Sequence, residues 1–427
     1  MGNYDATDNI LSSIIELLNH YEDVSITRIK SSRRADANFP KIEKLNFEEL
    51  VADNKKRCEE LVKMKYKFQI FSSTPDQLEK AFINNSARSF KFDFVIVDEA
   101  SQMDVGHFIP GLIKIAPSTQ FLLAGDHLQL PPISKVKIKG AEENYFGSIY
   151  DFFRKEYASF YPEMKSDLLY NRRSNETIVE FNKTAFNYPA AYQAVSTNAK
   201  GKISFKSSIN QNDVLDAALH PNFSTVLLSY EDGYSHQSNL FEAEKVLGLV
   251  SRAWEKQLIE FEKNKAYSIL NFFDKGLGIV VPHRAQRTVI QQLLMEYFID
   301  SNKHGFDQNI KKLLKEKIIS AVDTVEKYQG QQREIMICSY VLGDPDLISQ
   351  EEEFIFNPNR LNVIISRARF KVILIASDQL LSHASDDIDI IENQKSLLKY
   401  VEYTNKELDI SSDISWSQKS ARFRYRE

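Results

Sequence analysis

Two adjacent carboxylates stand at the end of an apolar run in the stretch FDFVIVDEASQ. The run FVIV has the character of a buried β-strand, and Asp98 and Glu99 follow it directly. Ligands of open parallel sheets bind at the carboxyl ends of the strands. The first carboxylate could hold Mg²⁺ beside phosphate groups, and the second could polarise an attacking water. The pair therefore indicates a nucleotide site, whereas a single acidic residue there often only caps a helix or turn.

A second polar group follows the next predicted strand. The run QFLLAG leads into Asp126 and Gln129 within AGDHLQLPP. A carboxamide at a neighbouring strand end can hydrogen-bond a terminal phosphate oxygen. Gly125, Asp126 and the proline pair would also suit a simple turn. The turn alone does not explain why this group comes one strand after the acidic pair.

Arginines in the second half of the chain could complete such a site. Arg173 comes just before a predicted helix, and the stretch NRLNVIISRARF predicts Arg360, Arg367 and Arg369 on a helix before the last strand. The spacing of Arg360 and Arg367 places them on one helical face. Arginines of a second domain can neutralise charge as a terminal phosphoryl group leaves. The alternative for SRAR is a solvated helix face.

Short apolar runs alternate with helical stretches along the chain. Several runs are continuously apolar, which is typical of strands covered on both faces. Alternation of this kind predicts α/β domains with parallel sheets and right-handed crossovers. The predicted strands are 67–73, 94–99, 120–125, 224–230, 278–282, 334–340 and 371–377, and the clearest helices are 175–186, 239–258 and 285–298.

Composition shifts divide the chain. A proline pair and a polar, basic stretch over 125–143 mark the end of the first sheet. A charged segment of helical pattern, about 35–66, is expected to contain no strand and to be a helical insertion. We therefore predict a first domain over 1–135 with that insertion, a connecting segment over 136–164 with a helix at 144–157, a second domain over 165–400, and a polar C-terminal tail over 401–427.

Bulk properties limit the function. The 427 residues are 43% hydrophobic and 26% charged, and the two cysteines, Cys58 and Cys338, form no disulfide or metal framework. With no secretory signal and no run that could span a membrane, we expect a cytoplasmic protein, or a nuclear one in a eukaryote. A net charge of −5 argues against binding polyanions over the whole surface. Local basic stretches remain as groove candidates, with solvated faces as the alternative: 27–34, 311–317 and 419–426.

The order of the polar stretches carries a resemblance. They are, in turn, NYDATDN, FSSTP, VDEASQ, AGDHLQLPP, LLYNRRS, GIVVPHRAQ, TVEKYQGQQRE and NRLNVIISRAR. This series resembles the motifs of the superfamily 1 helicases, in the branch of the nonsense-mediated-decay helicase and its DNA-replication and immunoglobulin-switch relatives. The resemblance runs from residue 3 to about 377, and GDHLQLPP is specific to this branch.

The resemblance implies two RecA-like domains with ATP between them, single-stranded DNA or RNA across them, and translocation from 5′ to 3′. It implies Asp98 as the Mg²⁺ ligand, Glu99 as the catalytic base and Gln129 as the γ-phosphate sensor. Arg173 and Arg367 would contact phosphate from the second domain. Further nucleotide contacts would be Asp126, Gly330, Gln332 and Arg360, and the strand-facing motifs contain Ser73, Thr74, Pro282, His283, Arg284 and Thr324.

Two departures from the family pattern are clear. The phosphate-binding loop G-x-x-x-x-G-K-[ST] does not occur, because the only Gly-Lys pair, Gly201-Lys202, lacks both the earlier glycine and the following Ser or Thr. Gln332 stands where the family usually has Glu. We expect the C-terminal portion of a longer helicase, inactive alone, whose first domain is incomplete at its N-terminus and needs a preceding segment or a partner to supply the loop. A naturally degenerate relative that binds nucleic acid without turnover is the alternative, and an unrelated nucleotide-binding protein is a third.

Overall fold

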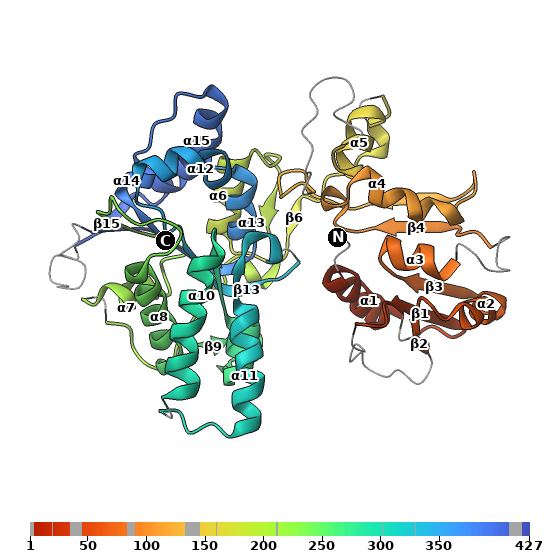
Figure 1. Cartoon of the computed structure of the whole chain (residues 1–427), viewed down its shortest axis with the longest axis horizontal. Helices are drawn as coiled ribbons and strands as arrows, with labels where there is room; N and C mark the ends of the chain where they lie inside the picture. The colour runs from red at the N-terminus through yellow and green to blue at the C-terminus, as the bar shows by residue number, and fades with distance from the viewer. Residues whose placement is uncertain are drawn as a thin grey trace. The chain divides into compact units, whose positions relative to one another are not determined.

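The computed structural model divides the chain into two compact units, Met1–Ser166 and Asp167–Glu427 (Figure 1). Each unit is described by itself below, as unit 1 and unit 2. The structure describes residues 4–18, 20–34, 45–82, 90–132, 146–158, 160–210, 212–301, 303–328, 330–409 and 421–427.

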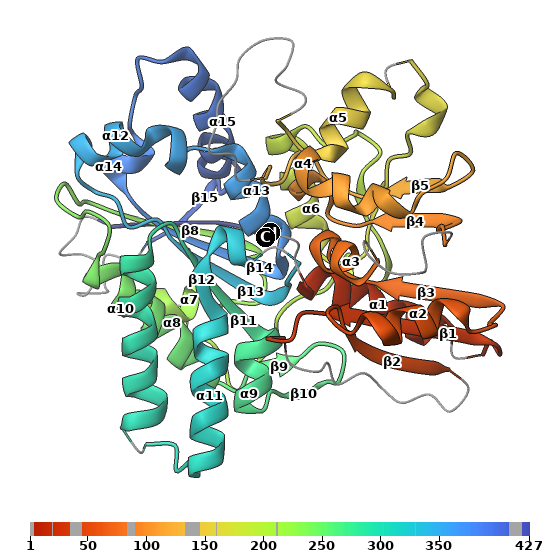
Figure 2. The same cartoon turned by 45° about the vertical axis from the view of Figure 1, so that its right-hand side comes forward.

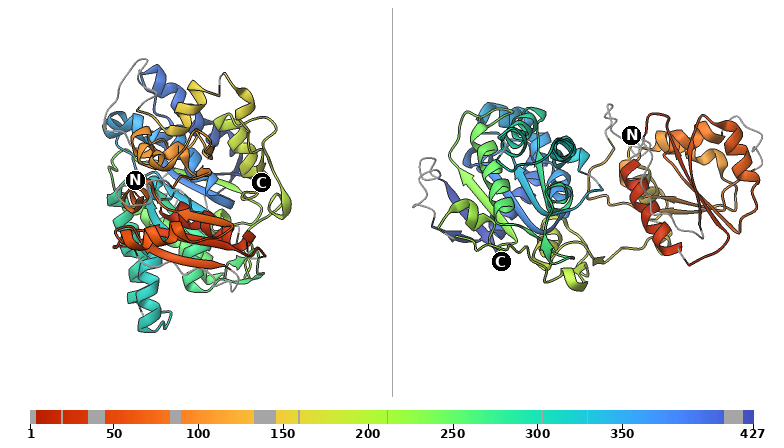
Figure 3. Two further views of the ribbon diagram at one scale, coloured as in Figure 1. Left: turned by 90° about the vertical axis from the view of Figure 1, so that its right-hand side faces the viewer. Right: turned by 90° about the horizontal axis from the view of Figure 1, so that it is seen from below.

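Unit 1 begins with a three-stranded parallel sheet in the order β2-β1-β3. Side chains alternate along the central strand, so Ile26 packs on one face with helix α1 and Ile29 on the other with α2 and α3. Figure 3 shows helices on both sides of this sheet. Both faces of this sheet are therefore covered. The elements are α1 (Tyr4–Leu18), β1 (Val24–Lys30), β2 (Asn46–Val51), α2 (Lys55–Lys63), β3 (Phe68–Ser72) and α3 (Pro75–Phe82).

The rest of unit 1 is built on a parallel strand pair, β4 (Phe94–Val97) and β5 (Gln120–Leu123). Val97 is buried in a small core with Phe108 and Ile149, which come from the helices after β4 and before unit 2. This core covers one face of the pair. The accompanying helices are η2 (Ala100–Gln102), α4 (Val105–Phe108), η3 (Ile109–Lys114), α5 (Ile149–Glu156) and η5 (Pro162–Met164).

Unit 2 contains a seven-stranded sheet in the order β12-β11-β13-β14-β8-β16-β15 (Figure 2). The strands from β12 to β8 are parallel, and β16 and β15 add an antiparallel edge. Their bounds are β8 (Thr225–Tyr230), β11 (Leu277–Val281), β12 (Val322–Thr324), β13 (Arg333–Ser339), β14 (Ala368–Ser377), β15 (Lys406–Leu408) and β16 (Arg422–Arg426).

Helices cover both faces of this sheet. The main core lies between the sheet and α7, α8, α10 and α11, and the opposite face carries α6, α13 and α15 (Figure 2). The helices are α6 (Glu176–Phe186), α7 (Val214–Ala218), α8 (Leu240–Glu255), α9 (Ile269–Asn271), η7 (Phe272–Gly276), α10 (Arg284–Met295), η8 (Glu296–Asp300), α11 (Gln308–Ala321), η9 (Val325–Lys327), α12 (Pro345–Ile355), α13 (Pro358–Ser366), α14 (Asp378–Leu381) and α15 (Ile388–Tyr403). Minor elements are β6 (Tyr170–Asn171), β7 (Gln193–Ala194), η6 (Ser196–Asn198), β9 (Ile259–Glu260) and β10 (Lys265–Ala266).

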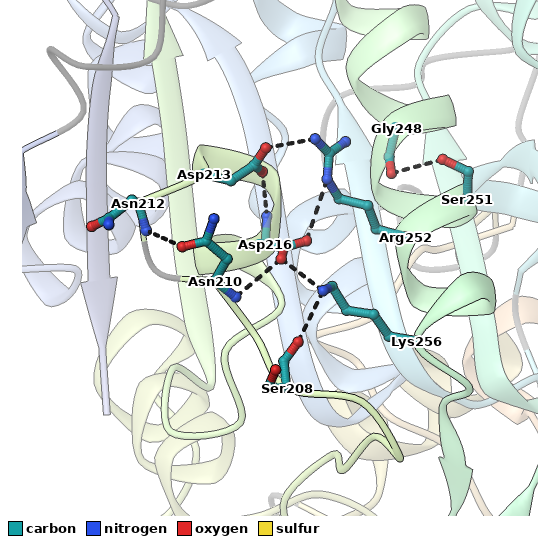
Figure 4. A network of polar contacts seen from close by, with 9 residues as sticks. All are labelled: Ser208, Asn210, Asn212, Asp213, Asp216, Gly248, Ser251, Arg252 and Lys256. Atoms are coloured by element: carbon teal, nitrogen blue, oxygen red, sulfur yellow. Dashed lines mark hydrogen bonds and ion pairs between the residues drawn. The ribbon is translucent and has the colours of Figure 1, made fainter.

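A polar network holds α7 against α8 (Figure 4). Asp213 caps the start of α7 and accepts a hydrogen bond of 2.6 Å from Arg252 of α8. Asp216 is buried, accepts the N–H of Asn210 at 3.0 Å, and lies 2.8 Å from the ammonium of Lys256 and 3.3 Å from Arg252 Nε. Two carboxylates and two cations thus join the two helices.

The expected α/β architecture with parallel sheets is confirmed, as are the seven predicted strands, although their ends differ by up to three residues. The prediction that 35–66 holds no strand is wrong, because β2 lies there and pairs with β1 in parallel. Leu50 is buried in the core. The charged residues that suggested a helix surface instead form ion pairs with residues of neighbouring elements. Arg57 donates to Glu48 at 2.7 Å, and Glu49 lies 3.0 Å from Lys30. Residues 35–44 lie outside the described part.

The basic stretch 27–34 is only partly a surface feature. Arg28 and Lys30 are buried in β1. Arg28 donates to Asp8 of α1 at 2.6 Å and lies 3.4 Å from Glu49. These two cations therefore neutralise internal carboxylates and do not form a groove.

The predicted polar tail is also corrected. Residues 422–426 form β16, which pairs antiparallel with β8 and brings Phe423 opposite Leu228. Phe423 is 1% exposed, and the ring of Tyr425 stacks on Phe223. Alternation of apolar and basic residues buries one side of the strand and leaves the arginines outside. Residues 410–420 lie outside the described part.

Two further points concern the whole described chain. Within the residues that the structure describes, no helix is both long enough and apolar enough to span a bilayer. Cys58 and Cys338 are both buried as free thiols, and burial raises the pKa of each above its ordinary value.

Candidate nucleotide and nucleic-acid site

The ends of β4 and β5 are joined side by side. The two strands run in parallel, with Val97 opposite Leu123. Beyond them, the N–H of Ala100 donates to the carbonyl of Ala124 at 2.8 Å, and the N–H of Asp126 donates to the hydroxyl of Ser101 at 3.2 Å. The two polar turns predicted from the sequence therefore lie next to each other.

Gly125 allows this close approach. A Cβ atom at this position would lie 2.8 Å from the backbone nitrogen of Ser101 and 3.1 Å from the ring of Tyr150. Neither neighbour is the end of a flexible chain, so a side chain here would push the two strand ends apart. The glycine thus has a packing reason within the site.

Asp98 and Glu99 differ in environment. Asp98 is half-buried, and burial raises the pKa of its carboxyl group, opposed by the backbone N–H of Glu99. Glu99 has a left-handed backbone with φ +52°, and its carboxylate accepts a hydrogen bond of 2.6 Å from Gln102. A non-glycine residue in this region stores strain, which is common at functional sites.

A divalent cation fits the surroundings of Asp98. A carboxylate whose pKa is raised by burial would be stabilised in its charged form by a nearby cation. Among the described residues, no three His, Cys, Asp or Glu side chains lie close enough together to form a metal site. A Mg²⁺ ion at Asp98 would therefore take its other ligands from water and phosphate oxygens, as Mg²⁺ often does.

Asp126 and Gln129 form the turn that the sequence offered as the alternative. Asp126 accepts the N–H of Leu128 at 3.0 Å through one carboxylate oxygen and the amide of Gln129 at 3.1 Å through the other. The carboxamide of Gln129 is thus bonded to Asp126 in this structure. A contact between Gln129 and a phosphate would require the side chain to leave that partner.

Arg173 and Arg367 come together in unit 2. Arg173 donates from Nη1 to the carbonyl of Ser366 at 2.9 Å, and Arg367 is the next residue, at the end of α13. Arg367 is buried, and its own Nη1 lies 3.5 Å from the carbonyl of Gln331. Both guanidinium groups are thus held by backbone carbonyls.

The loop after β12 is bound to α13. Arg360 forms an ion pair of 2.6 Å with Glu326 and packs 3.8 Å above the ring of Phe354. Gly330 takes φ +80°, a conformation natural for glycine, and Gln332 is exposed. Arg360 of α13 and Arg367, which follows the last residue of that helix, both reach this loop. Gln329 lies outside the described residues.

The placement predicted for Arg369 is wrong. Helix α13 ends at Ser366, and Arg369 lies in β14, which begins at Ala368. The register between β13 and β14 shifts between Arg333 and Ile335, so an irregularity in the ladder redirects this part of the strand. The guanidinium of Arg369 pairs with Glu262 at 3.0 Å.

The residues of unit 2 that were predicted to face a nucleic-acid strand lie at one end of the sheet. Val281 and Thr324 are opposite each other at the ends of β11 and β12, and Pro282 follows Val281 directly. His283 precedes α10, stacks on Phe354 with ring centroids 5.7 Å apart, and lies 3.1 Å from Glu351. Burial lowers the pKa of His283. Its ring is therefore largely occupied by packing, whereas Arg284 is exposed.

In unit 1, Ser73 and Thr74 lie at the carboxyl end of β3. The carbonyl of Thr74 accepts the first N–H groups of α3, from Gln77 and Leu78, and the hydroxyl of Ser73 donates to the same carbonyl at 2.9 Å. Thr74 is buried and Ser73 is half-buried. Both residues thus shape the start of α3.

Sequence reasoning missed two residues of the β4–β5 end. Ser101 accepts the N–H of Asp126, and Gln102 binds Glu99. Their position two and three residues after Glu99 was the available signal. Their polar side chains point back to the strand ends, so both help to fix the candidate catalytic residues.

The chain is similar to two family models and to several known helicases. A family model described as "AAA domain" matches residues 150–379, and a second one with the same description matches 22–137. An uncharacterized ATP-dependent helicase of Methanocaldococcus jannaschii is 26% identical over 325 residues, which are 75% of this chain and 41% of that protein. The DNA replication ATP-dependent helicase/nuclease DNA2 of several animals is also similar to this chain.

The protein from Bos taurus is 25% identical over 387 residues, covering 89% of this chain and 32% of the relative. The human protein is 25% identical over 318 residues, covering 70% and 27%. The chain thus spans less than half the length of these relatives. Together with the paired strand ends and the motif order, these matches show that the chain belongs to the superfamily 1 helicases, in the branch that includes the DNA replication helicase/nuclease.

Proposed function

We propose that the chain is the portion of an ATP-dependent helicase or translocase in which both units contribute residues to one ATP site. The observation that carries this proposal is the junction of the β4 and β5 ends. It brings Asp98 and Glu99 beside Asp126 and Gln129 through two hydrogen bonds between the turns. Three acidic groups and a carboxamide at neighbouring parallel strand ends suit a nucleoside triphosphate and its cation.

Each residue of unit 1 has a chemical role in this proposal. Mg²⁺ bound at Asp98 would neutralise charge on the phosphates. Glu99, held by Gln102, would orient and polarise the attacking water. Gln129 would exchange its bond to Asp126 for one to the γ-phosphate, and this exchange would report the presence of the terminal phosphate.

The arginines of unit 2 supply positive charge. Arg173 and Arg367 meet at the end of α13, so both would respond together when that end approaches phosphate. Guanidinium groups suit this task because they remain charged and donate in a fixed geometry. Arg360, Gly330 and Gln332 belong to the adjoining loop, which we propose contacts the nucleotide as well.

We further propose that the phosphate cradle comes from another segment that completes unit 1. Phe94 and Ile96 of β4 and Leu122 of β5 are each 50% exposed, although they lie in a parallel strand pair. Parallel sheets are normally covered on both faces. Val97, on the other side of β4, is buried in the core, so only one face is bare.

The same strand pair also has an available edge. Within the described residues, β5 pairs with β4 alone. A strand added beside β5 in parallel would end next to Asp126, and a following helix would cover Phe94, Ile96 and Leu122. A loop between that strand and helix would present its N–H groups to phosphate. This is the segment that we propose precedes the chain in a longer protein or belongs to a partner.

Single-stranded DNA or RNA is the proposed substrate, along which the protein would move from 5′ to 3′. Thr324, Pro282 and exposed Arg284 lie together at the ends of β11 and β12, and Ser73 lies at the end of β3. Polar loops of this kind bind the sugar-phosphate backbone with little regard to sequence, and such binding weakens as salt rises.

A catalytically inactive nucleic-acid-binding module is the second candidate. The specific observation behind it is that the 427 residues contain no G-x-x-x-x-G-K-[ST] sequence, together with Gln332 in place of the family's Glu. In that case no added segment would restore turnover. The intact set of Asp98, Glu99 and the two arginines favours the helicase.

The test begins with ATP hydrolysis by the purified chain, with and without single-stranded DNA or RNA, beside a Glu99→Gln control. We expect no turnover above the control, because the sequence contains no G-x-x-x-x-G-K-[ST] loop to hold the phosphates. Nucleic-acid-stimulated hydrolysis that disappears in Glu99→Gln would mean that the chain forms a complete site by itself, and the proposal of an added segment would then be wrong.

A further inference from the structure

The peptide group between Arg172 and Arg173 is held at both ends by asparagine side chains. The N–H of Arg173 donates to Asn171 Oδ1 at 2.8 Å. The carbonyl of Arg172 accepts from Asn198 Nδ2 at 2.6 Å. The N–H of Ser174 also donates to Asn171 Oδ1 at 2.8 Å. This peptide plane is therefore fixed from two directions, by one acceptor and one donor.

Each asparagine is itself anchored. Asn171 Nδ2 donates to the hydroxyl of Tyr192 at 2.6 Å, and the ring of Tyr192 stacks on Tyr188 with centroids 4.8 Å apart. Asn362 of α13 donates to the hydroxyl of Tyr188 at 3.0 Å. The stacked tyrosines thus connect Asn171 to the helix whose end carries Arg367.

The other side is anchored to the sheet. Asn198 Oδ1 lies 3.4 Å from the guanidinium of Arg369 in β14. Directly after Arg173, the hydroxyl of Ser174 donates to the carbonyl of Ala368 at 2.6 Å, and the N–H of Asn175 donates to the carbonyl of Arg369 at 2.8 Å. Arg173 therefore leaves a backbone that α13, β14 and the segment 188–198 hold rigidly.

We propose that Asn171 and Asn198 are positioning residues that fix the direction in which Arg173 leaves the backbone, so that its guanidinium stays at the carbonyl of Ser366. This inference rests on the proposed role of Arg173 at the phosphate, because that role gives the clamp its purpose. The clamp itself is a statement about geometry and is testable without nucleotide. An arginine side chain adopts many conformations unless both its backbone and its guanidinium group are held in place. A small displacement of a phosphate-binding group strongly reduces its contribution to catalysis.

The two asparagines contribute opposite chemistry, which makes the proposal specific. Position 171 must accept two N–H groups, and an aspartate can do so. Tyr192 can then donate its hydroxyl proton to that carboxylate. Position 198 must donate to a carbonyl, and an aspartate cannot. Asn171→Asp should therefore retain the clamp, and Asn198→Asp should lose it.

The experiment measures phenylglyoxal modification of Arg173 in the full chain by peptide mass spectrometry, relative to exposed Arg284 in the same sample. We expect the relative rate to rise about fivefold in Asn171→Ala and in Asn198→Ala, because loss of one hydrogen bond opens the contact with Ser366 more often. The relative rate in Asn171→Asp should equal that of the protein without substitutions, and the rate in Asn198→Asp should equal that of Asn198→Ala. Asn222→Ala, which removes a surface hydrogen bond to Lys202 in the same unit, is the matched control and should change nothing.

If the Asn171→Ala variant folds and its relative modification rate is unchanged, the proposed clamp is wrong. If the alanine variants do not fold, the two aspartate variants decide, and equal rates in both would overturn it as well. The role of Arg173 at the phosphate is tested apart from this, by Arg173→Ala in an ATP hydrolysis assay of the chain completed with a phosphate-binding segment, because the chain alone is expected to hydrolyse no ATP. If that substitution left hydrolysis unaffected, the proposed function would be wrong, while the chemical modification result would still stand.

Discussion

The guanidinium of Arg173 donates a 2.9 Å hydrogen bond to the carbonyl of Ser366, a residue 193 positions away in the sequence. Arg367 follows Ser366, so this bond brings two arginines from distant segments to one point of unit 2. A stretch before α6 and the end of α13 are thereby joined at the residues that we propose face phosphate.

Replacing Arg173 should therefore affect stability as well as chemistry. We expect Arg173→Ala and Arg173→Lys to lower the free energy of unfolding by about 1 kcal/mol each, because both lose the fixed guanidinium bond. Equilibrium unfolding in urea measures this. Arg172→Ala, at the exposed neighbour, should stay within about 0.5 kcal/mol of the unmodified protein. Equal losses at positions 172 and 173 would contradict the observed contact.

The bare face of β4 predicts a contrast between two neighbouring residues. Ile96 is 50% exposed and Val97 is 8% exposed. Ile96→Thr should change the free energy of unfolding of the chain by less than about 0.5 kcal/mol, whereas Val97→Thr should cost about 1–2 kcal/mol because it places a hydroxyl in the core. Urea unfolding of both variants checks this. A larger loss from Ile96→Thr would mean that the face is already covered.

Ile96→Thr should also reduce the fluorescence of a dye that binds exposed apolar surface, such as anilinonaphthalene sulfonate. The chain offers this dye a patch of Phe94, Ile96 and Leu122. A polar side chain in the middle of the patch should weaken dye binding, and Val97→Thr in folded protein should not. An identical dye signal in Ile96→Thr would place the apolar surface elsewhere.

The sequence predicted the strands whose apolar residues form unbroken runs. FVIV and QFLL contain no charge, and the acids that follow them indicated the site. In contrast, β1 was missed because its sequence VSITRIK contains two cations. Arg28 and Lys30 are tolerated inside because Asp8 and Glu49 come from other elements to pair with them. No local pattern announces partners of that kind.

The candidate site was predictable to a similar degree. The position of Asp98 and Gln129 at strand ends followed from the order of the elements, but the bond between Gln129 and Asp126 depends on the turn geometry. The prediction for Arg369 failed because α13 ends at Ser366 and β14, which pairs with β13 in an irregular register, begins at Ala368. The clamp of Asn171 and Asn198 joins segments that only the fold brings together.

The network between α7 and α8 predicts a stability effect in unit 2 (Figure 4). Asp216→Ala should lower the free energy of unfolding by about 1–3 kcal/mol, since it removes the partner of Lys256 and Arg252 and leaves the N–H of Asn210 without its acceptor. Ser251→Ala, on the same helix, loses only a bond to its own helix backbone and should change stability by less than about 0.5 kcal/mol. Thermal unfolding of both variants provides the comparison, and similar losses would contradict the role given to Asp216.

Buried Glu242 predicts a dependence of stability on pH. Burial raises the pKa of Glu242 to about 7, above the ordinary value of 4.5, although Tyr230, Ser339 and the N–H of Val341 bond to the carboxyl group. A carboxyl group whose pKa is higher in the folded than in the unfolded state stabilises the fold at pH values below the unfolded pKa. This stabilisation is lost as pH rises from 4.5 to about 7. The folded state binds the extra proton in that interval.

We therefore expect the difference in free energy of unfolding between the unmodified protein and Glu242→Gln to fall as pH rises from 5 to 8. Urea unfolding of both proteins across this range measures the difference and cancels the effect of other groups. These include Glu334, whose pKa burial also raises to about 7. A difference that stayed constant with pH would show that Glu242 does not titrate in this interval.

We propose that Asp98 and Glu99 of unit 1 act in hydrolysis once an added segment supplies the phosphate cradle. The most direct measurement is ATP hydrolysis, stimulated by single-stranded nucleic acid, in a chimera. In it, a strand, a loop of the sequence G-x-x-x-x-G-K-[ST] and a following helix are fused ahead of residue 1. We predict hydrolysis in the chimera, loss of it in chimeras with Glu99→Gln or Arg173→Ala, and loss on Ile96→Lys, which would block the added helix. A folded chimera that binds nucleic acid and hydrolyses no ATP would contradict the account.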